Sequence, residues 1–378
     1  METMKIKWTL SVCLAVMVCL SLPKISRALP DSNFQRLFNV GYRVLDLKYQ
    51  NKKHSQTVTV AVWYPTAAQP ELHCYGGPTK GFVSIDAAPL ADGNAYPLLV
   101  FSHGYGGSGI GSVFFTEALA ARGWIVACPD HNDRHSAVRI RNGQLKNFDR
   151  IGLLRHAKEI SVSSPEDREK YLYRLDEMQI VLDSMLSSDL FGKIINRDCI
   201  AVGGHSFGGF TALGLCGAIK ERYDPRIKAL LLFSTGAGGY LYKEEELKNV
   251  RIPTMLFMGE LEADQRRGLK TMYELSTKIY SNVSSPKYFL VIKGANHFSF
   301  NNRFVDNYWS GLLSGNEEQF NVIRLYSIAF LEKHVSGKND YNMILEQKNP
   351  MLVEYLKDSN IDAANVKIEE NKKKNVQN

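Results

Sequence analysis

The sequence predicts an α/β fold in which a mostly parallel sheet carries helices on both faces. Three observations predict it: continuous apolar runs of strand length recur along the chain, amphipathic stretches separate them, and a pair of alternating segments precedes them. Runs that are apolar throughout are typical of strands buried on both faces. Strands that alternate with helices form parallel sheets through right-handed crossovers.

The alternating segments are "YRVLDLKY" at 42–49 and "TVTVAVWYP" at 57–65. Apolar and polar residues follow one another there with the period of two that a half-buried strand requires. We therefore expect these segments to pair antiparallel, as a hairpin at the start of the sheet.

Buried strands follow the hairpin. They are predicted at 97–103, 124–130, 199–206, 227–234, 253–259 and 287–294. Helices are predicted between them, among others at 112–123 and 207–219, because apolar residues recur there with helical spacing.

Residues 131–164 interrupt this alternation with a polar, basic insertion, which we expect to form a rim or lid over the strand ends. Asn142-Gly143 predicts a hairpin turn inside it. A long helix should follow, because Ser164 suits an N-cap and Pro165 suits the first helical position. Its apolar stripe is expected to pack on the sheet and consists of Leu172, Leu175, Leu182 and Met185.

The two ends of the chain are predicted to lie outside the main domain, which we place at 29–337. Residues 1–28 combine a basic start, a short apolar run and small residues near the end, which is the layout of a cleaved signal peptide. This predicts a secreted or periplasmic protein, and an uncleaved signal anchor is the alternative. Residues 338–378 form a charged C-terminal extension, and its last part, 360–378, is predicted to be disordered.

The composition is that of a globular protein with a sizeable core, at 44% hydrophobic and 22% charged residues. The formal net charge is +7, of which residues 1–28 contribute four basic residues against one acidic, so that about +4 remains without them. A charge this small does not indicate a nucleic-acid partner.

Four cysteines remain beyond the signal: Cys74, Cys128, Cys199 and Cys216. No CxxC spacing indicates zinc. Cys128 and Cys199 lie in strand-like runs, which favours buried free thiols, whereas export would allow one or two disulfides. The pairing stays open, as do the oligomeric state and glycosylation of Asn282 in "NVS".

The stretch "VGGHSFGG" places Ser206 between the predicted strand and the helix at 207–219. A nucleophile elbow needs this arrangement, with glycines two positions to either side so that the backbone can approach closely. The alternative is a small residue in a glycine-rich turn. Because the strand and the helix are both predicted, we interpret Ser206 as a nucleophile.

A serine hydroxyl needs a base to take its proton. "GANHFSF" places His297 just after the last predicted strand, where such a base is expected, and a packed structural histidine is the alternative. The backbone N–H groups of Phe207 and of Tyr105, in "HGYGGSG", are the predicted oxyanion donors. His103 is expected to hold this loop, and His205 to point away from Ser206.

The acid that orients the histidine is less clearly marked. The strand ending at Phe233 is followed by "STGAGG", which has no carboxylate, whereas the next strand ends in "MGELEADQ". We place the acid at Glu262, with Asp264 as the first alternative and Glu260 as the second; each carboxylate could instead be solvated. The run "DHNDRH" at 130–135 is an alternative metal site, but its ligand types lie in one loop without a second cluster, and we predict no metal.

Aromatic residues surround the predicted base. Phe298 and Trp309 are predicted to bind substrate, together with Phe300 and Tyr308, by lining an apolar pocket. The alternative is that these rings belong to the core.

The stretches "VAVWYPT", "FSHGYGGS", "CPDHNDRHSA" and "IAVGGHSFGG" together resemble the secreted platelet-activating-factor acetylhydrolases, also called lipoprotein-associated phospholipases. The likeness extends from residue 40 to about 335, and "HNDRHSA" is its most specific part. The later "GANHFSFNN" and "YSIAFLEKHV" look more like cutinase-like polyester hydrolases and dienelactone-hydrolase relatives. Both groups imply an α/β-hydrolase fold of about eight strands with a Ser-His-acid triad. The acetylhydrolases carry their acid at a position that looks like Ser234 here, and this departure puts the phospholipid substrate in doubt.

The resemblance implies a secreted serine esterase that works through an acyl-enzyme, without a cofactor, on phospholipids with short or oxidised acyl chains. A small-molecule or lipid ester would be its substrate, and a lipid surface a further partner. The first alternative is a cutinase-like or general acyl esterase. The second is a hydrolase fold that binds ligands without catalysis.

Overall fold

The computed structural model describes residues 37–51, 54–236, 241–263, 272–302 and 314–359. The predicted signal peptide and the predicted disordered end at 360–378 lie outside the described residues.

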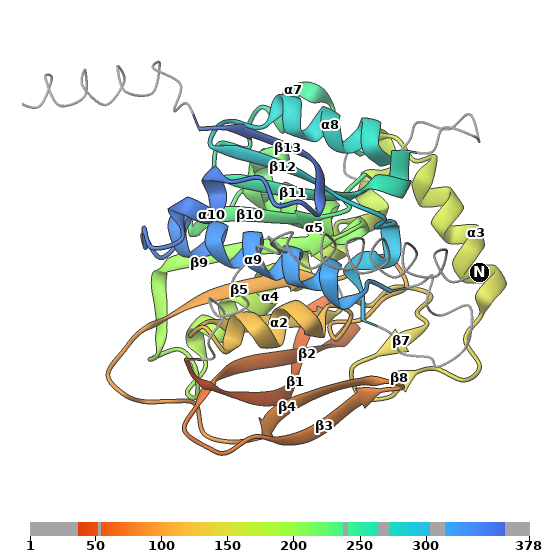
Figure 1. Ribbon diagram of the computed structural model, residues 1–378. Coiled ribbons are helices and arrows are strands. Elements are labelled where there is room, and N and C mark those ends of the chain that lie inside the picture. Colours follow the sequence, from red (N-terminus) through yellow and green to blue (C-terminus); the bar gives the residue numbers. More distant parts are fainter. Residues whose placement is uncertain (1–36, 52–53, 237–240, 264–271, 303–313, 360–378) are drawn as a thin grey trace, which may run out of the picture. The chain divides into compact units, whose positions relative to one another are not determined.

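Eleven of the described strands form one large sheet in the order β13-β12-β11-β10-β9-β5-β6-β2-β1-β4-β3, and β7 and β8 form a separate pair (Figure 1). Neighbours from β6 through β5, β9, β10 and β11 to β12 all pair in parallel. The strands are β1 Asn39–Asn51, β2 His54–Thr66, β3 Glu71–Gly76, β4 Thr79–Ile85, β5 Tyr96–Ser102, β6 Ile125–Asp130, β9 Ile195–His205, β10 Ile227–Phe233, β11 Thr254–Gly259, β12 Lys287–Ile292 and β13 Leu352–Asp358.

The predicted α/β fold is confirmed. The opening hairpin forms as expected, with β1 antiparallel to β2 along its whole length. All six predicted buried strands form as well, and in β6 and β11 every residue is buried. This burial explains why continuous apolar runs, rather than alternation, marked them in the sequence.

Three strands were not predicted from the sequence. The hairpin of β3 and β4 extends one edge of the sheet, and β13 adds an antiparallel strand beside β12 at the other edge. Because β13 lies at 352–358, the sheet continues beyond residue 337, where we ended the main domain. An edge strand has one unpaired side and an exposed face, so charged residues suit it and its sequence lacks an apolar run.

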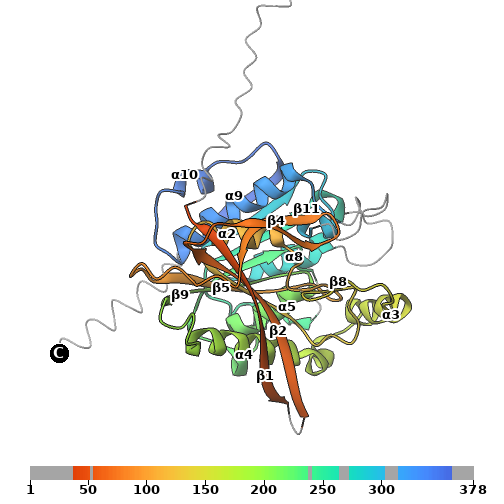
Figure 2. The same ribbon diagram turned by 90° about the horizontal axis from the view of Figure 1, so that it is seen from below.

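Helices cover both faces of the sheet, as Figures 1 and 2 show. α2 (Val113–Ala120) and α9 (Glu317–His334) lie on one face and contact each other, while α4 (Tyr173–Ser187) and α5 (Phe207–Leu213) lie on the other. α8 (Met272–Asn282) packs against β11 and β12. Among the helices within the described residues, none combines the length and apolar character that crossing a bilayer requires.

The shorter helical elements connect the strands or follow them. They are α7 Glu244–Leu247, α10 Asn342–Glu346, η2 Pro165–Tyr171, η3 Gly214–Ala218, η4 Lys220–Arg222, η5 Glu260–Ala263 and η6 His297–Phe300.

The insertion after β6 contains a small hairpin and a helix. β7 (Val138–Arg139) pairs antiparallel with β8 (Gly143–Gln144), and Gly143 has a φ of 58°, so the predicted turn is confirmed. α3 (Arg150–Ser161) follows and appears at one side of the molecule in Figure 1.

The helix predicted after Ser164 is divided into η2 and α4, which meet at Leu172. The Asp167 carboxylate accepts a hydrogen bond of 3.1 Å from the Ser164 N–H at its start. The predicted stripe packs on the sheet: Leu175, Leu182 and Met185 are buried in the main core cluster and Leu172 packs against its edge.

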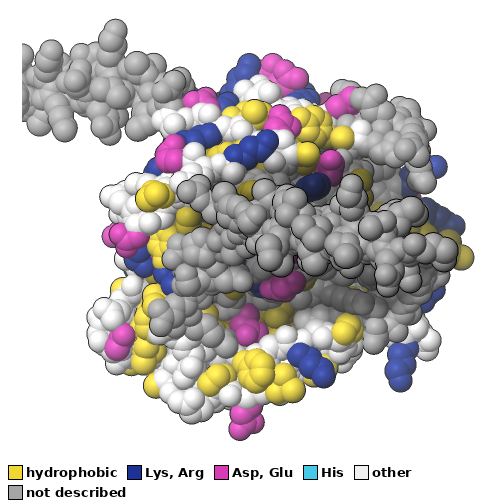
Figure 3. Space-filling model, viewed as in Figure 1, with side chains coloured by type: hydrophobic (Ala, Val, Ile, Leu, Met, Phe, Trp, Pro, Cys, Tyr) yellow, Lys and Arg dark blue, Asp and Glu magenta, His cyan; other side chains and the backbone are white. Residues whose placement is uncertain are grey.

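The described surface carries some apolar side chains. In Figure 3 several lie near the lower edge of the view, where β3 and β4 run, and the exposed large apolar residues of these strands are Leu72, Phe82 and Ile85. All four cysteines at positions 74, 128, 199 and 216 are free; Cys128 is buried, as expected, and Cys199 is half-buried.

Candidate active site

Ser206 lies in a sharp turn between β9 and α5. Its backbone has φ 54° and ψ −118°, a conformation that residues other than glycine seldom adopt. The Ser206 N–H donates a 2.9 Å hydrogen bond to the carbonyl of Phe233, at the end of the neighbouring strand. This strained geometry projects the hydroxyl beyond the carboxyl ends of the parallel strands, as the elbow pattern predicts.

The glycines on either side of Ser206 are required by close backbone contacts. A Cβ on Gly204 would lie 2.3 Å from the backbone of Gly208. A Cβ on Gly208 would lie 2.0 Å from the carbonyl oxygen of Ser102. Backbone atoms cannot move aside as a flexible side chain can, so the turn tolerates no larger residue at these two positions.

The structure brings His297 to Ser206. Nε2 of His297 lies 2.9 Å from the Ser206 Oγ. His297 begins the short helix η6, whose N-cap Asn296 accepts a 2.8 Å hydrogen bond from the Phe298 N–H. The cap sets the backbone direction at the point where the imidazole leaves the sheet.

Of the two candidate carboxylates that the structure describes, Glu262 lies beside His297 and Glu260 does not. Its Oε2 lies 3.1 Å from Nδ1 of His297, and its Oε1 accepts a 2.7 Å hydrogen bond from the Gly259 N–H. Glu260 is directed elsewhere and accepts from the Gly294 N–H at 2.7 Å. Asp264 lies outside the described residues.

Ser234 is a member of the site that the sequence analysis missed. It is fully buried, and its Oγ lies 2.5 Å from Oε2 of Glu262 and 2.5 Å from Nδ1 of His297. Its φ of 46° is in the left-handed region. The sequence offered one signal, its place directly after a buried strand, but we treated the position only as one that lacks a carboxylate.

The two predicted oxyanion donors belong to segments that meet at Ser206. Phe207 is the first residue of α5, so its N–H has no acceptor within the helix. The loop that carries Tyr105 approaches from β5, because a Cβ on Gly104 would lie 3.1 Å from the Ser206 Cβ. The rings of Tyr105 and Phe207 are in edge contact, with centroids 6.3 Å apart. The segments that carry the two predicted donors therefore both border Ser206.

Two further histidines, His205 and His103, contact the backbone beside the site. Nε2 of His205 lies 2.9 Å from the carbonyl oxygen of His297. Burial, together with the nearby His297, lowers the pKa of His205 to about 3, so this imidazole is neutral at ordinary pH. His103 contacts the loop after β5 that carries Tyr105, since its Nδ1 lies 2.6 Å from the Gly104 carbonyl oxygen.

The acidic and histidine residues at 130–135 each contact a different partner and do not converge on one point. Asp130 accepts from the Gly109 N–H at 2.8 Å, His131 lies 2.7 Å from Glu177, and Asp133 pairs with Arg174. Within the described ranges, no three or more His, Cys, Asp or Glu side chains gather in a way that could hold a metal ion.

The predicted aromatic pocket is only partly described. The ring of Phe298 lies in edge contact with His297. Because Phe298 is 46% exposed, its ring is accessible to a substrate. Phe300 is fully buried and stacks on Phe233, so it belongs to the core and does not line a pocket. Tyr308 and Trp309 lie outside the described residues.

The similarity of this chain to known proteins agrees with the resemblance noted in its motifs. Residues 78–187 match the sequence family described as platelet-activating factor acetylhydrolase, isoform II. The platelet-activating factor acetylhydrolase of Canis lupus familiaris is 28% identical over 298 residues, which cover 70% of this chain and 64% of the relative. That of Cavia porcellus is 26% identical over 312 residues, covering 72% and 66%. The chain thus spans slightly under two thirds of the length of these relatives.

A solved structure supports the fold. A ferulic acid esterase from Streptomyces cinnamoneus matches with a TM-score of 0.64 at 19% sequence identity, over 87% of this chain and 98% of the esterase. The chain therefore has the α/β-hydrolase fold and resembles the platelet-activating factor acetylhydrolases in sequence.

Proposed function

We propose that this protein is a serine esterase that hydrolyses carboxylic esters through an acyl-enzyme. The observation that carries the proposal is the continuous chain from the Ser206 hydroxyl through His297 to Glu262, with contacts of 2.9 Å and 3.1 Å. A serine, a histidine and a carboxylate in this order and at these distances are the parts that nucleophilic attack on an ester requires.

In the first half-reaction, Ser206 Oγ attacks the carbonyl carbon of the ester while Nε2 of His297 takes its proton. The N–H groups of Tyr105 and Phe207 stabilise the negative charge that forms on the carbonyl oxygen. Glu262 holds the imidazole in place and stabilises its charged form. The imidazolium then gives its proton to the leaving alkoxide, which departs as an alcohol.

In the second half-reaction, water attacks the acyl-enzyme and His297 takes a proton from the water. The same two N–H groups stabilise the second tetrahedral intermediate, and the proton returns to the Ser206 Oγ as the carboxylic acid leaves.

For the substrate, we propose phospholipids with a short or oxidised acyl chain. The support is the similarity to relatives named platelet-activating factor acetylhydrolase. The rival substrate class is soluble or polymeric acyl esters, toward which the name of the ferulic acid esterase points.

We also propose that the enzyme meets its substrate at a lipid surface through the outer face of α3 and its C-cap. Ile151, Leu154 and Val162 are 71%, 70% and 65% exposed there, and Arg155 and Lys158 lie exposed among them. Apolar side chains interspersed with cations suit an interface that contains anionic lipid. On the inner side of the same helix, Nδ1 of His156 lies 2.5 Å from the Tyr105 hydroxyl oxygen, so α3 lies beside the segment that carries Tyr105.

Sedimentation with phosphatidylserine vesicles tests the α3 face. Ile151→Ser combined with Leu154→Ser should lower the bound fraction, whereas Met343→Ser on α10, where the side chain is also 71% exposed, should not. Equal binding by all three proteins contradicts this part of the proposal.

A fluorophosphonate probe tests the catalytic proposal directly. Wild type should be labelled and Ser206→Ala should not, and only wild type should hydrolyse p-nitrophenyl acetate. If wild type is neither labelled nor active, the protein is a binding module with a hydrolase fold. If wild type is labelled and active, a substrate panel separates the substrate classes. The panel compares short and long p-nitrophenyl esters with a phospholipid that carries a two-carbon sn-2 chain.

Export is a further part of the proposal and rests on the predicted signal peptide at 1–28, outside the described residues. N-terminal sequencing of protein recovered from the medium or periplasm should give a start near residue 29. Recovery of the intact N-terminus in a membrane fraction would favour the uncleaved anchor.

A further inference from the structure

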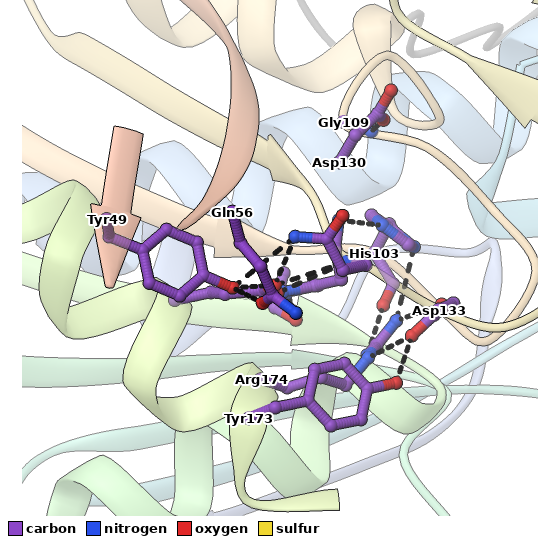
Figure 4. Close-up of polar contacts among 12 residues, drawn as sticks. Tyr49, Gln56, His103, Gly109, Asp130, Asp133, Tyr173 and Arg174 are labelled. Carbon is purple, nitrogen blue, oxygen red and sulfur yellow. Dashed lines mark hydrogen bonds and ion pairs between the residues drawn. The ribbon is translucent and has the colours of Figure 1, made fainter. Parts of the chain in front are cut away.

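A buried ion pair lies behind the loop that carries Tyr105. Arg174, in the first turn of α4, contacts Asp133, which follows β6 in the chain. Nε of Arg174 donates to Oδ1 of Asp133 at 2.9 Å, Nη2 donates to Oδ2 at 2.8 Å, and both side chains are completely buried. Figure 4 shows the pair beside His103 and Tyr173. The mechanism described above uses neither residue.

The Arg174 guanidinium contacts both segments that carry the predicted oxyanion donors. Nη1 donates a 2.9 Å hydrogen bond to the carbonyl oxygen of His103, two residues before Tyr105. The guanidinium carbon lies 4.9 Å from the centroid of the Phe207 ring, within the range of a cation–π contact. One side chain thus joins the loop after β5 to the start of α5.

The loop after β5 needs restraint from outside itself, because Gly104, Gly106 and Gly107 give its backbone wide conformational freedom. Part of the restraint comes from the His103 ring. Its Nε2 accepts a 3.0 Å hydrogen bond from the His131 N–H, so a neutral ring carries its proton on Nδ1 and donates to the Gly104 carbonyl. Arg174 holds the preceding carbonyl, and together these two contacts set the peptide planes that lead to Tyr105.

Asp133 in turn holds Arg174. Its Oδ1 also accepts a 2.6 Å hydrogen bond from the Tyr173 hydroxyl, so the carboxylate is fixed from two adjacent residues of α4 (Figure 4). A buried ion pair adds little stability over well-packed apolar side chains. An apolar residue at 174, however, could not donate to the His103 carbonyl, so what the pair supplies is the orientation of this loop.

We propose that Asp133 and Arg174 are positioning residues. They hold the backbone N–H groups of Tyr105 and Phe207 in the orientation that lets both donate hydrogen bonds to the oxyanion. This inference rests on the proposed esterase function. The pair does not touch the substrate; it acts through the His103 carbonyl and the Phe207 ring.

Arg174→Lys tests the proposal, because it keeps the positive charge beside Asp133 and loses the forked geometry. We expect kcat for p-nitrophenyl acetate to fall by about 10- to 100-fold, since small displacements of oxyanion donors have effects of this size. KM should change by no more than about threefold, because the ground-state ester does not depend on the oxyanion contacts. The inhibition constant of a trifluoromethyl ketone, whose adduct with Ser206 carries an oxyanion, should rise in parallel with the fall in kcat.

Arg222→Lys is the matched control, because Arg222 pairs with Asp176 on the same helix α4 in a partly exposed ion pair. It should leave kcat and inhibitor affinity unchanged. Thermal unfolding of all variants reports the fold. If Arg174→Lys does not fold, Asp133→Asn replaces it, since the amide keeps one oxygen acceptor for Arg174, and a several-fold loss of kcat at constant KM is expected.

Unchanged kcat in a folded Arg174→Lys protein overturns the inference, as does a loss that appears equally in Arg222→Lys. If Asp133→Asn is used because Arg174→Lys does not fold, unchanged kcat in Asp133→Asn overturns the inference. Wild type that fails to hydrolyse esters or to react with the fluorophosphonate contradicts the proposed function instead, so the two failures are told apart.

Discussion

The hydroxyl of Ser234 donates a 2.5 Å hydrogen bond to the Glu262 carboxylate, which itself lies beside His297. The same hydroxyl oxygen lies 2.5 Å from Nδ1 of His297. The imidazole is therefore approached by oxygens from the ends of two neighbouring strands, β10 through Ser234 and β11 through Glu262. We therefore expect both the Ser234 hydroxyl and the Glu262 carboxylate to orient the His297 imidazole.

Glu262→Gln should lower kcat for p-nitrophenyl acetate by about 10²- to 10⁴-fold, because the amide cannot stabilise the imidazolium. Glu260→Gln is the control and should have a milder effect, since Glu260 accepts from the Gly294 N–H and does not contact His297. Asp264→Asn is also expected to be milder. A larger loss in either control than in Glu262→Gln would move the acid to that residue.

Ser234→Ala should lower kcat by about 3- to 10-fold, the effect of losing one buried hydrogen bond worth roughly 1 kcal/mol. In a Glu262→Gln background, Ser234→Asp should recover part of the activity, because it places a carboxylate at the end of β10 within reach of Nδ1. Ser234→Asn in the same background is the control without a charge. Equal activity of the Asp and Asn variants would show that a carboxylate at position 234 cannot replace the carboxylate of Glu262.

His334 should make stability depend on pH. Burial, with Lys333 and Lys357 nearby, lowers its pKa in the folded protein to about 4 from an ordinary value of 6.5. The unfolded chain then binds more protons between these pH values, so stability is complete above pH 6.5 and is lost as pH falls toward 4, with a slope of up to about 1.4 kcal/mol per pH unit. His334→Gln should flatten the dependence of the unfolding free energy, measured in urea at pH 7, 6 and 5. An equal slope in variant and wild type would assign the dependence to other groups.

The cysteines should differ in reactivity toward a thiol reagent. All four described thiols are free, with Cys74 exposed and Cys128 and Cys216 buried. Burial raises the pKa of Cys128 and of Cys216, which further lowers their thiolate fraction. Native protein should therefore react rapidly at Cys74, and Cys74→Ser should abolish this fast phase. Denatured, unreduced protein that lacks residues 1–28, and with them Cys13 and Cys19, should expose four thiols, whereas a lower count would reveal a disulfide.

The central part of the fold was predictable because each buried strand has its own apolar run and the helices predicted between the strands have apolar residues at helical spacing. β3, β4 and β13 were missed for a physical reason. They lie toward the edges of the sheet, where neighbours and solvent share the surface, and Phe82 and Leu356 are more than a third exposed. Such strands form because the sheet beside them offers hydrogen bonds, and their own sequences carry little signal.

The candidate site was predictable to a similar extent. Ser206 and His297 carry local signals, a glycine-flanked turn and a position after the last buried strand, and the structure places them 2.9 Å apart. Ser234 carries only the weaker signal of its place directly after a buried strand, which does not by itself distinguish a functional serine. Arg174 likewise appears in the sequence as one basic residue on an amphipathic helix.

By itself, the sequence determined the α/β order of the chain and marked Ser206 and His297 as candidates for catalysis, because both signals depend on neighbours within about a dozen residues. The tertiary structure decided what surrounds them. The register of β9, β10, β11 and β12 brings positions 206, 234, 262 and 297 together, and the Gly259 N–H aims Glu262, rather than Glu260, at the imidazole. Contacts of this kind join residues 28 to 91 positions apart, and only the packed sheet brings them within hydrogen-bonding distance.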